Sequence, residues 1–200
     1  MSQRAEILEW AKNAGIFRAR EAEARGVTRA TLSRLVETGE LERLERGFYR
    51  LAGEAVTENH TLALVAKRID GGVVCLISAL AFHGLTTQLP SAVWVAISPN
   101  RRAFENNAYP PVEITFMSPA VLEYGVDEHR IEKVLVRITN PAKTVADCFK
   151  HRNKVGIDVA LEALRDFRRL RKGSIDELWQ AAKVCRVTRT LRPYLQAIHG

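Results

Sequence analysis

The sequence predicts an α+β protein, with a small helical module at the N-terminus and a larger mixed domain after it. Three observations predict this class. Residues 5–38 show helical periodicity interrupted by glycines, residues 93–138 contain β-branched runs separated by prolines, and residues 141–198 return to amphipathic helices. A chain of 200 residues can hold both parts. We therefore predict domains at residues 1–53 and 54–200.

Composition excludes several classes of protein. The sequence has no run of about 18 apolar residues, and charged residues recur throughout its first thirty positions. We expect a soluble, cytoplasmic protein that makes no contact with a membrane. Cys75, Cys148 and Cys185 are far apart and lie among apolar residues, which favours reduced core thiols over disulfides or a zinc site. We expect no metal and no cofactor.

The net charge of +7 is unevenly distributed along the chain. Residues 1–52 carry a formal charge of +2, residues 53–140 carry −2 and residues 141–200 carry +7. A basic total alone only suggests a polyanionic partner. The prediction of DNA binding therefore depends on the pattern of the first fifty residues and not on the total charge.

Three short helices are predicted in the N-terminal module. Residues 5–14 place apolar side chains at helical spacing and are followed by a glycine. Residues 18–25 are rich in helix formers and close at Gly26. Thr28 can cap a third helix that extends to residue 38.

The third helix would bury Leu32 and Leu35 and expose a small, polar face around Arg34. Small residues let a helix approach base edges in the major groove, and an arginine can bind guanine through two hydrogen bonds. An ordinary solvated face would look similar in isolation. The predicted DNA contacts of this helix and its start are Thr28, Arg29, Thr31, Ser33 and Arg34.

The segment that follows favours a DNA-binding face over an ordinary solvated face. Residues 40–51 read as a β-hairpin whose turn contains Gly47. Three helices followed directly by a basic hairpin predict a winged helix-turn-helix, in which the hairpin contacts the DNA backbone. The predicted phosphate contacts are Arg43, Arg46 and Arg50 in the hairpin and Arg18 and Arg20 at the start of the second helix.

The larger domain is predicted to contain a small sheet followed by helices. Its predicted strands are residues 73–76, 93–97, 112–116 and 131–138. Its predicted helices are residues 57–69, a helix capped by Ser78, residues 142–150 after the Asn140-Pro141 cap, residues 157–170, a helix after the Ser174 capping box, and residues 190–198.

No set of residues in the sequence marks an active site. The five histidines are scattered, and none has a metal-ligand partner on the same element. Ser78 and His83 lack the turn motif of a nucleophilic serine. Asp127, Glu128 and Asp147 are isolated carboxylates. We expect a protein that is not an enzyme.

A second basic cluster lies near the C-terminus. It could contact phosphates, dock an acidic partner or simply be a solvated helix face, because rows of arginine are common on exposed helices. Its residues are Arg165, Arg168, Arg169, Arg171 and Lys172.

Three segments together resemble the AbiEi-type antitoxins of bacterial type IV toxin-antitoxin systems, which act in abortive infection. They are residues 15–51 (GIFRAREAEARGVTRATLSRLVETGELERLERGFYRL), 78–85 (SALAFHGL) and 139–154 (TNPAKTVADCFKHRNK). The third is the most specific, and the resemblance extends over nearly the whole chain.

The resemblance implies two activities. The N-terminal domain would bind double-stranded DNA at inverted repeats upstream of its own operon and repress transcription. The C-terminal domain would be needed to neutralise a separately encoded nucleotidyltransferase-like toxin, as part of phage defence. Two alternatives remain open: a stand-alone regulator with a ligand-sensing or dimerising C-terminal domain, and a nucleic-acid enzyme guided by the winged helix.

Overall fold

The computed structural model describes residues 3–101 and 109–199 and has the mixed α+β composition that the sequence predicts. It divides into two compact units, each with its own hydrophobic core. Unit 1 comprises Met1–Asp70 and Arg130–Val136, and unit 2 comprises Gly71–His129 and Arg137–Gly200. The predicted domains were residues 1–53 and 54–200. The observed unit 1 extends further, to Asp70, and also includes Arg130–Val136.

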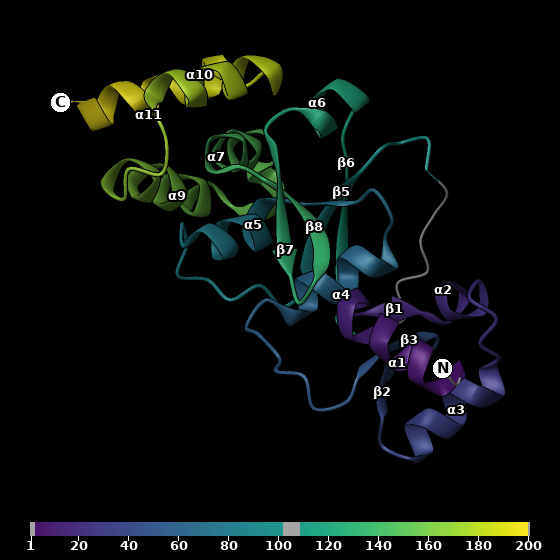
Figure 1. Ribbon diagram of the computed structural model, residues 1–200. Coiled ribbons are helices and arrows are strands. Elements are labelled where there is room, and N and C mark those ends of the chain that lie inside the picture. The colour runs from purple at the N-terminus through teal and green to yellow at the C-terminus, as the bar shows by residue number, and fades with distance from the viewer. Residues whose placement is uncertain (1–2, 102–108, 200) are drawn as a thin grey trace. The chain divides into compact units, whose positions relative to one another are not determined.

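Unit 1 alternates short helices and strands (Figure 1). Its elements are α1 (Gln3–Ala14), β1 (Phe17–Arg18), α2 (Ala19–Glu23), α3 (Arg29–Glu37), β2 (Leu41–Glu45), β3 (Phe48–Leu51) and α4 (His60–Arg68). The strands form an antiparallel sheet in the order β1-β3-β2. The predicted hairpin is β2 and β3, and Gly47 turns the chain between them with a φ of 82°.

The second predicted helix is shorter than expected at both ends. Residue 18 was expected to be helical, but Phe17 and Arg18 pair with Tyr49 and Phe48 of β3 as an additional strand. The helix therefore begins at Ala19, whose N–H donates to the carbonyl of Gly47 at 2.8 Å. This bond ties the start of α2 to the turn of the hairpin.

Phe17 lies at the centre of the core of unit 1 and is fully buried. Its ring meets Trp10 of α1 edge to face at 4.8 Å and stacks on Tyr49 of β3 at 5.9 Å. Leu32 and Leu35 of α3 pack into the same cluster. Burial of these apolar side chains fixes the orientation of α3, and therefore determines which of its faces remains in solvent.

The segment Arg130–Val136 is held to the rest of unit 1 by polar contacts. Glu132 accepts hydrogen bonds from the backbone N–H of Thr57 at 2.8 Å and pairs with His60 at 2.6 Å. Gly15 meets the same segment, since a Cβ placed there would lie 2.0 Å from the carbonyl oxygen of Glu132. Only glycine fits this close approach.

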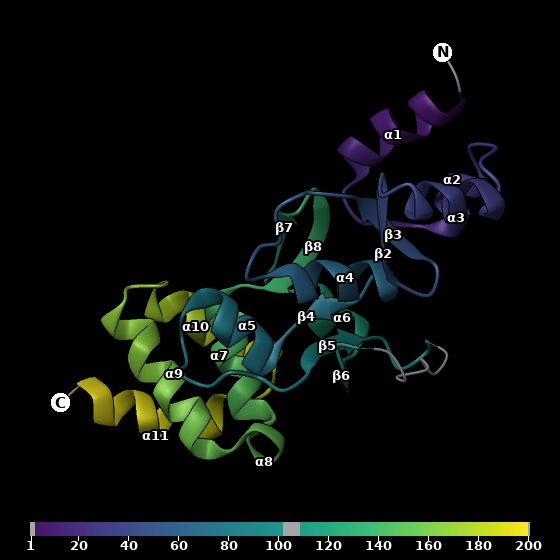
Figure 2. The ribbon, with the colours of Figure 1, turned by 90° about the horizontal axis from the view of Figure 1, so that it is seen from below.

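Unit 2 contains most of a five-stranded sheet and a layer of helices (Figure 2). The strands, in the order β6-β5-β4-β8-β7, are β4 (Val73–Val74), β5 (Val93–Ile97), β6 (Val112–Phe116), β7 (Val126–Ile131) and β8 (Val134–Thr139). The helices are α5 (Leu76–His83), α6 (Pro119–Glu123), α7 (Pro141–Lys150), α8 (Arg152–Val155), α9 (Ile157–Arg169), α10 (Ile175–Val184) and α11 (Thr188–His199).

Helix α7 is the centre of unit 2. It packs against α5, α9, α10 and α11, and every residue from Ala142 to Phe149 is buried. Its start is the predicted cap, because the Asn140 side chain accepts a hydrogen bond from the N–H of Lys143 at 2.9 Å and Pro141 occupies the first turn. The helix thus begins where the sequence predicts.

The prediction of one strand over residues 131–138 is wrong, because these residues belong to two strands and the turn between them. Glu132 and Lys133 both have positive φ, 48° and 67°, and form the turn between β7 and β8. The predicted Ser78 cap is also displaced, because α5 is capped at Cys75 and begins at Leu76, three residues earlier than a helix capped by Ser78. Ser78 instead accepts a hydrogen bond from the N–H of Trp94 at 2.9 Å, which links α5 to β5.

Candidate nucleic-acid interface

Helix α3 presents an exposed polar face. Its start is capped by Thr28, whose hydroxyl accepts a hydrogen bond from the N–H of Thr31 at 3.2 Å. Leu32 and Leu35 are buried, while Ala30, Ser33, Arg34 and Glu37 on the opposite side are exposed. This is the small, polar face around Arg34 that the sequence predicts.

The two arginines of α3 differ in their surroundings. The Arg29 guanidinium pairs with Glu23 at 2.6 Å, and this hydrogen bond raises the pKa of Arg29 above its ordinary value. Arg34 is exposed, and its side chain has no ion-pair partner among residues 3–101 and 109–199. Arg34 is therefore the cation of this face that is available to an external anion.

The hairpin between β2 and β3 carries two exposed arginines. Arg46 lies in the turn beside Gly47 and has no side-chain partner in the part of the chain that the structure describes. Arg43 lies on β2, and its Nε donates to the carbonyl of Glu45 at 3.4 Å. Both cations can contact an external phosphate without breaking an ion pair.

Arg18 and Arg20 have partners at the end of α4 instead. The Nε of Arg18 donates to the carbonyl of Lys67 at 2.8 Å, and its Nη1 pairs with Asp70 at 3.1 Å. The same guanidinium lies over the ring of Phe48 at 5.6 Å. Arg20 also pairs with Asp70, at 3.0 Å. These contacts give Arg18 an internal structural role.

Arg50 is 8% exposed and is held by Glu42, with the two guanidinium nitrogens Nη2 and Nε at 2.6 and 2.8 Å from one carboxylate oxygen. Removing such a cation from its partner is costly. The phosphate contacts of Arg18 and Arg50 remain predictions, and the geometry favours Arg34, Arg43 and Arg46 over both.

The C-terminal basic cluster lies on α9 and just after it. Arg165, Arg171 and Lys172 are exposed, whereas Arg168 is half-buried. Arg169 pairs with Asp166 within its own helix at 2.8 Å. The cluster is therefore a partly paired helix face that continues into the following turn.

Unit 2 contains a buried ion pair that was not predicted from the sequence. The side chains of Lys143 and Asp147 are 0% and 1% exposed and pair with each other one turn apart on α7. The thiol of Cys185 donates to the other oxygen of Asp147 at 3.2 Å. The available signal was a lysine and an aspartate four residues apart in an otherwise apolar helix.

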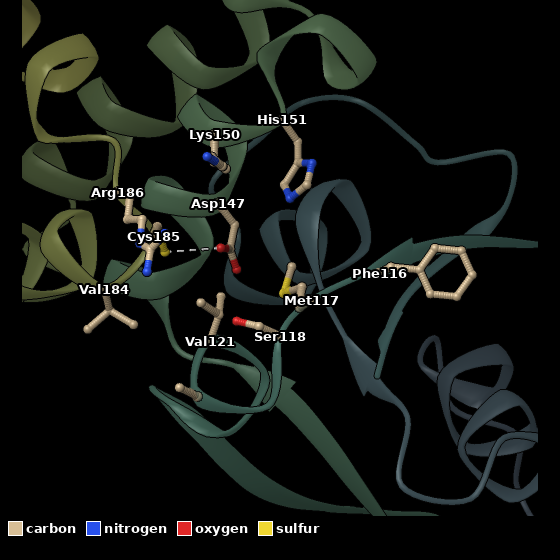
Figure 3. A pocket seen from close by; sticks show the side chains of 11 residues that line it. Phe116, Met117, Ser118, Val121, Asp147, Lys150, His151, Val184, Cys185 and Arg186 are labelled. Carbon is tan, nitrogen blue, oxygen red and sulfur yellow. Dashed lines mark hydrogen bonds between the residues drawn. The ribbon is translucent and has the colours of Figure 1, made fainter. Parts of the chain in front are cut away.

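The side chain of Asp147 lines a pocket of about 540 Å³ at the ends of α7 and α10 (Figure 3). Three residues that can carry positive charge, Lys150, His151 and Arg186, lie around it. Burial lowers the pKa of His151, and the neighbouring lysines lower it further, although Asp147 opposes them. This pocket is a second candidate site, independent of the α3 face.

Three further observations concern the cysteines, metal binding and membrane-spanning helices. Burial raises the pKa of the Cys75, Cys148 and Cys185 thiols well above the ordinary value, and all three are free. Within residues 3–101 and 109–199, no three His, Cys, Asp or Glu side chains are grouped to hold a metal ion. No helix in these ranges has the length and apolar character to span a membrane.

A solved structure and a family model both resemble this chain. The crystal structure of the RV2827C protein from Mycobacterium tuberculosis resembles this chain with a TM-score of 0.58 at 12% identity, over 90% of this chain and 71% of that one. This likeness concerns the fold alone. No curated protein matches the sequence.

The family match covers part of the range over which the sequence resembles AbiEi-type antitoxins. A family model described as "Transcriptional regulator, AbiEi antitoxin" matches residues 5–52, which include α1 to α3 and the β2–β3 hairpin. The segments at residues 78–85 and 139–154 lie outside the match. Over residues 5–52 the chain is therefore similar to the AbiEi antitoxin family of transcriptional regulators.

Proposed function

We propose that this chain is a DNA-binding transcriptional repressor whose unit 1 reads DNA as a winged helix-turn-helix. The observation that carries the proposal is the exposed face of α3. It is capped by Thr28, contains an arginine without an internal partner at Arg34, and is followed directly by a hairpin with Arg46 at its turn. The match of the same residues to a family of transcriptional regulators supports it.

In this proposal α3 lies in the major groove. Ala30 and Ser33 are small enough for a close approach to base edges, and Arg34 donates two hydrogen bonds to a guanine. Thr28 and Thr31 lie at the start of the helix, where hydroxyls and backbone N–H groups contact phosphates. Base contacts supply sequence specificity, while phosphate contacts fix the position of the helix.

The hairpin supplies the second set of contacts. Arg46 in the turn and Arg43 on β2 would lie against phosphates beside the groove, in the manner of a wing. Each phosphate neutralised by a cation releases counterions from the DNA and makes binding dependent on salt. The hairpin therefore adds affinity without adding sequence specificity.

We further propose that the chain represses its own operon at inverted repeats and is the antitoxin of a nucleotidyltransferase-like toxin in a type IV system. This part depends on the resemblance of residues 78–85 and 139–154 to AbiEi-type antitoxins. In this proposal the antitoxin acts by binding and not by catalysis. The raised pKa values of the Cys75, Cys148 and Cys185 thiols support this, because a thiol must lose its proton to act as a nucleophile.

A second candidate function is a regulator whose C-terminal part senses a ligand. The pocket beside Asp147 favours it, because a hollow of about 540 Å³ is of the size that small molecules occupy. Both candidates bind DNA through unit 1. In the second candidate, a ligand bound in unit 2 controls DNA binding.

Footprinting of the DNA upstream of the chain's own reading frame tests the repressor. We expect the full chain to protect two half-sites related by inverted repeat, with centres about 34–36 Å or a multiple apart. Protection that spreads evenly over the fragment would contradict the proposal, since it would show binding through phosphates alone.

Co-expression with a nucleotidyltransferase-like gene from the same operon tests the antitoxin. We expect growth to be restored by the wild type and equally by Arg34→Ala, because Arg34 is assigned to DNA reading and not to neutralisation. Failure of the wild type to restore growth would contradict the antitoxin role and leave the repressor intact, whereas failure of Arg34→Ala alone would make rescue depend on DNA binding.

A further inference from the structure

The pocket in unit 2 combines an apolar wall with a basic rim. Met117, Val121 and Val184 contribute apolar surface, and Lys150 and Arg186 contribute cations from the ends of α7 and α10. In Figure 3 these side chains surround the Asp147 carboxylate, while Phe116 points away from it. A hollow of this composition suits a small ligand that has one charged and one apolar end.

The negative charge of Asp147 is compensated from inside the protein. The Lys143 ammonium, fully buried behind it, pairs with one carboxylate oxygen, and the Cys185 thiol donates to the other at 3.2 Å. Asp147 is only 1% exposed. The charge that the pocket presents to a ligand is therefore that of its rim.

The cations of the rim are free to bind. Lys150 and Arg186 are both exposed, and neither has an ion-pair partner in residues 3–101 or 109–199. His151 adds an imidazole whose pKa burial lowers first and nearby lysines lower further, so that it offers one N–H donor and one acceptor near neutral pH. Two unpaired cations beside a neutral donor make an anion site.

We propose that this pocket binds a small organic phosphate. The phosphate group would be held by Lys150, Arg186 and the His151 ring, because a guanidinium and an ammonium together match the charge and the oxygens of a phosphate monoester. The organic part would lie against Met117, Val121 and Val184. The proposal does not depend on DNA binding, since every residue it uses belongs to unit 2.

The chain offers a matched pair of variants for the test. Arg186 and Arg171 occupy the same backbone position, the left-handed residue after a helix, with φ values of 55° and 52°. Glycine is the residue that this position prefers. Arg186→Gly and Arg171→Gly therefore each remove one guanidinium at a position where the backbone accepts glycine, and only Arg186 lines the pocket.

Calorimetric titration of the full chain in the absence of DNA tests the proposal. The probe is adenosine monophosphate, with adenosine and inorganic phosphate as controls. We expect the monophosphate to bind at least tenfold more tightly than either control. We expect Arg186→Gly to weaken it at least tenfold and Arg171→Gly to leave it unchanged. Lys150→Gln should act like Arg186→Gly.

Three results would overturn the proposal. Absence of binding by both the monophosphate and inorganic phosphate at millimolar concentration would leave the pocket without its assigned ligand class. Equal binding of the two would mean that free phosphate is the ligand and that the apolar wall has no role. Equal weakening by Arg186→Gly and Arg171→Gly would indicate general attraction to a basic surface. Circular dichroism of each variant checks that the fold is retained.

Discussion

Arg46 lies at the turn of the hairpin, exposed and without an internal side-chain partner in the described part of the chain. Arg46→Ala should therefore weaken binding to all DNA sequences similarly and reduce the slope of log affinity against log salt by about 1. Fluorescence anisotropy at several salt concentrations measures both quantities. A loss confined to the upstream site would contradict the assignment of Arg46 to phosphates.

His83 gives the fold a dependence on pH. Burial lowers its pKa, and His129 and Lys172 lower it further, while a hydrogen bond to the Thr139 carbonyl at 2.7 Å and Asp127 oppose them. A histidine whose pKa is lower in the folded state binds a proton more readily when unfolded. Its stabilising effect is complete above the ordinary histidine pKa of about 6.5 and declines as the pH falls below that value.

We therefore expect the free energy of unfolding to fall between pH 7.5 and pH 5.5. His151, whose pKa shifts in the same direction, should contribute to the same decline. In His83→Gln, which keeps an N–H donor for Thr139, the decline should be smaller. Urea unfolding at the two pH values measures this, and equal stability of the wild type at both would contradict the account.

At the scale of single elements, the sequence predicted the features that depend on local apolar spacing or on a local turn. The exposed face of α3, the cap at Asn140 and the β2–β3 hairpin were predicted because each depends on local spacing or a local turn. The two-residue strand β1 was not, because its pairing with β3 depends on residues thirty positions away. The turn at Glu132 and Lys133 was missed because neither residue is the glycine or asparagine that usually marks a positive φ.

The pair of Lys143 and Asp147 in α7 was missed for a different reason. Charged residues usually mark the solvated side of a helix, but α7 is covered by α5, α9 and α10, so that its polar residues are buried too. The pocket beside this pair involves residues from three separate parts of unit 2. Spacing within one element could not indicate it.

Replacing one member of the buried pair in α7 should lower the free energy of unfolding. Asp147→Leu leaves the Lys143 ammonium buried without its carboxylate and should cost about 3–5 kcal/mol in the free energy of unfolding. Adding Lys143→Met should recover most of the loss, since two apolar residues then replace the pair. Urea unfolding of the single and double variants measures this. A double variant less stable than the single one would contradict the account.

At the scale of the molecule, the compact unit that carries α3 extends beyond the hairpin. Helix α4 holds it through Arg68, whose pair with Glu45 at 2.7 Å is largely buried, and through the Lys67 carbonyl and Asp70, which bind Arg18. A fragment of residues 1–55 loses these contacts, whereas residues 1–70 keep them. We expect the longer fragment to melt at a clearly higher temperature by circular dichroism, and equal melting would contradict a structural role for α4.

The measurement that most directly tests the central claim compares the wild type, Arg34→Ala and Lys12→Ala on the upstream DNA and on a scrambled sequence. Lys12 is an exposed cation on α1 of the same unit and outside the proposed interface, so it controls for the loss of one charge. We predict that Arg34→Ala weakens binding to the upstream site by about 1–3 kcal/mol and leaves scrambled DNA nearly unaffected, while Lys12→Ala changes neither. Upstream affinity that is unchanged in Arg34→Ala, or that falls equally in both variants, would contradict reading of DNA by the exposed face of α3.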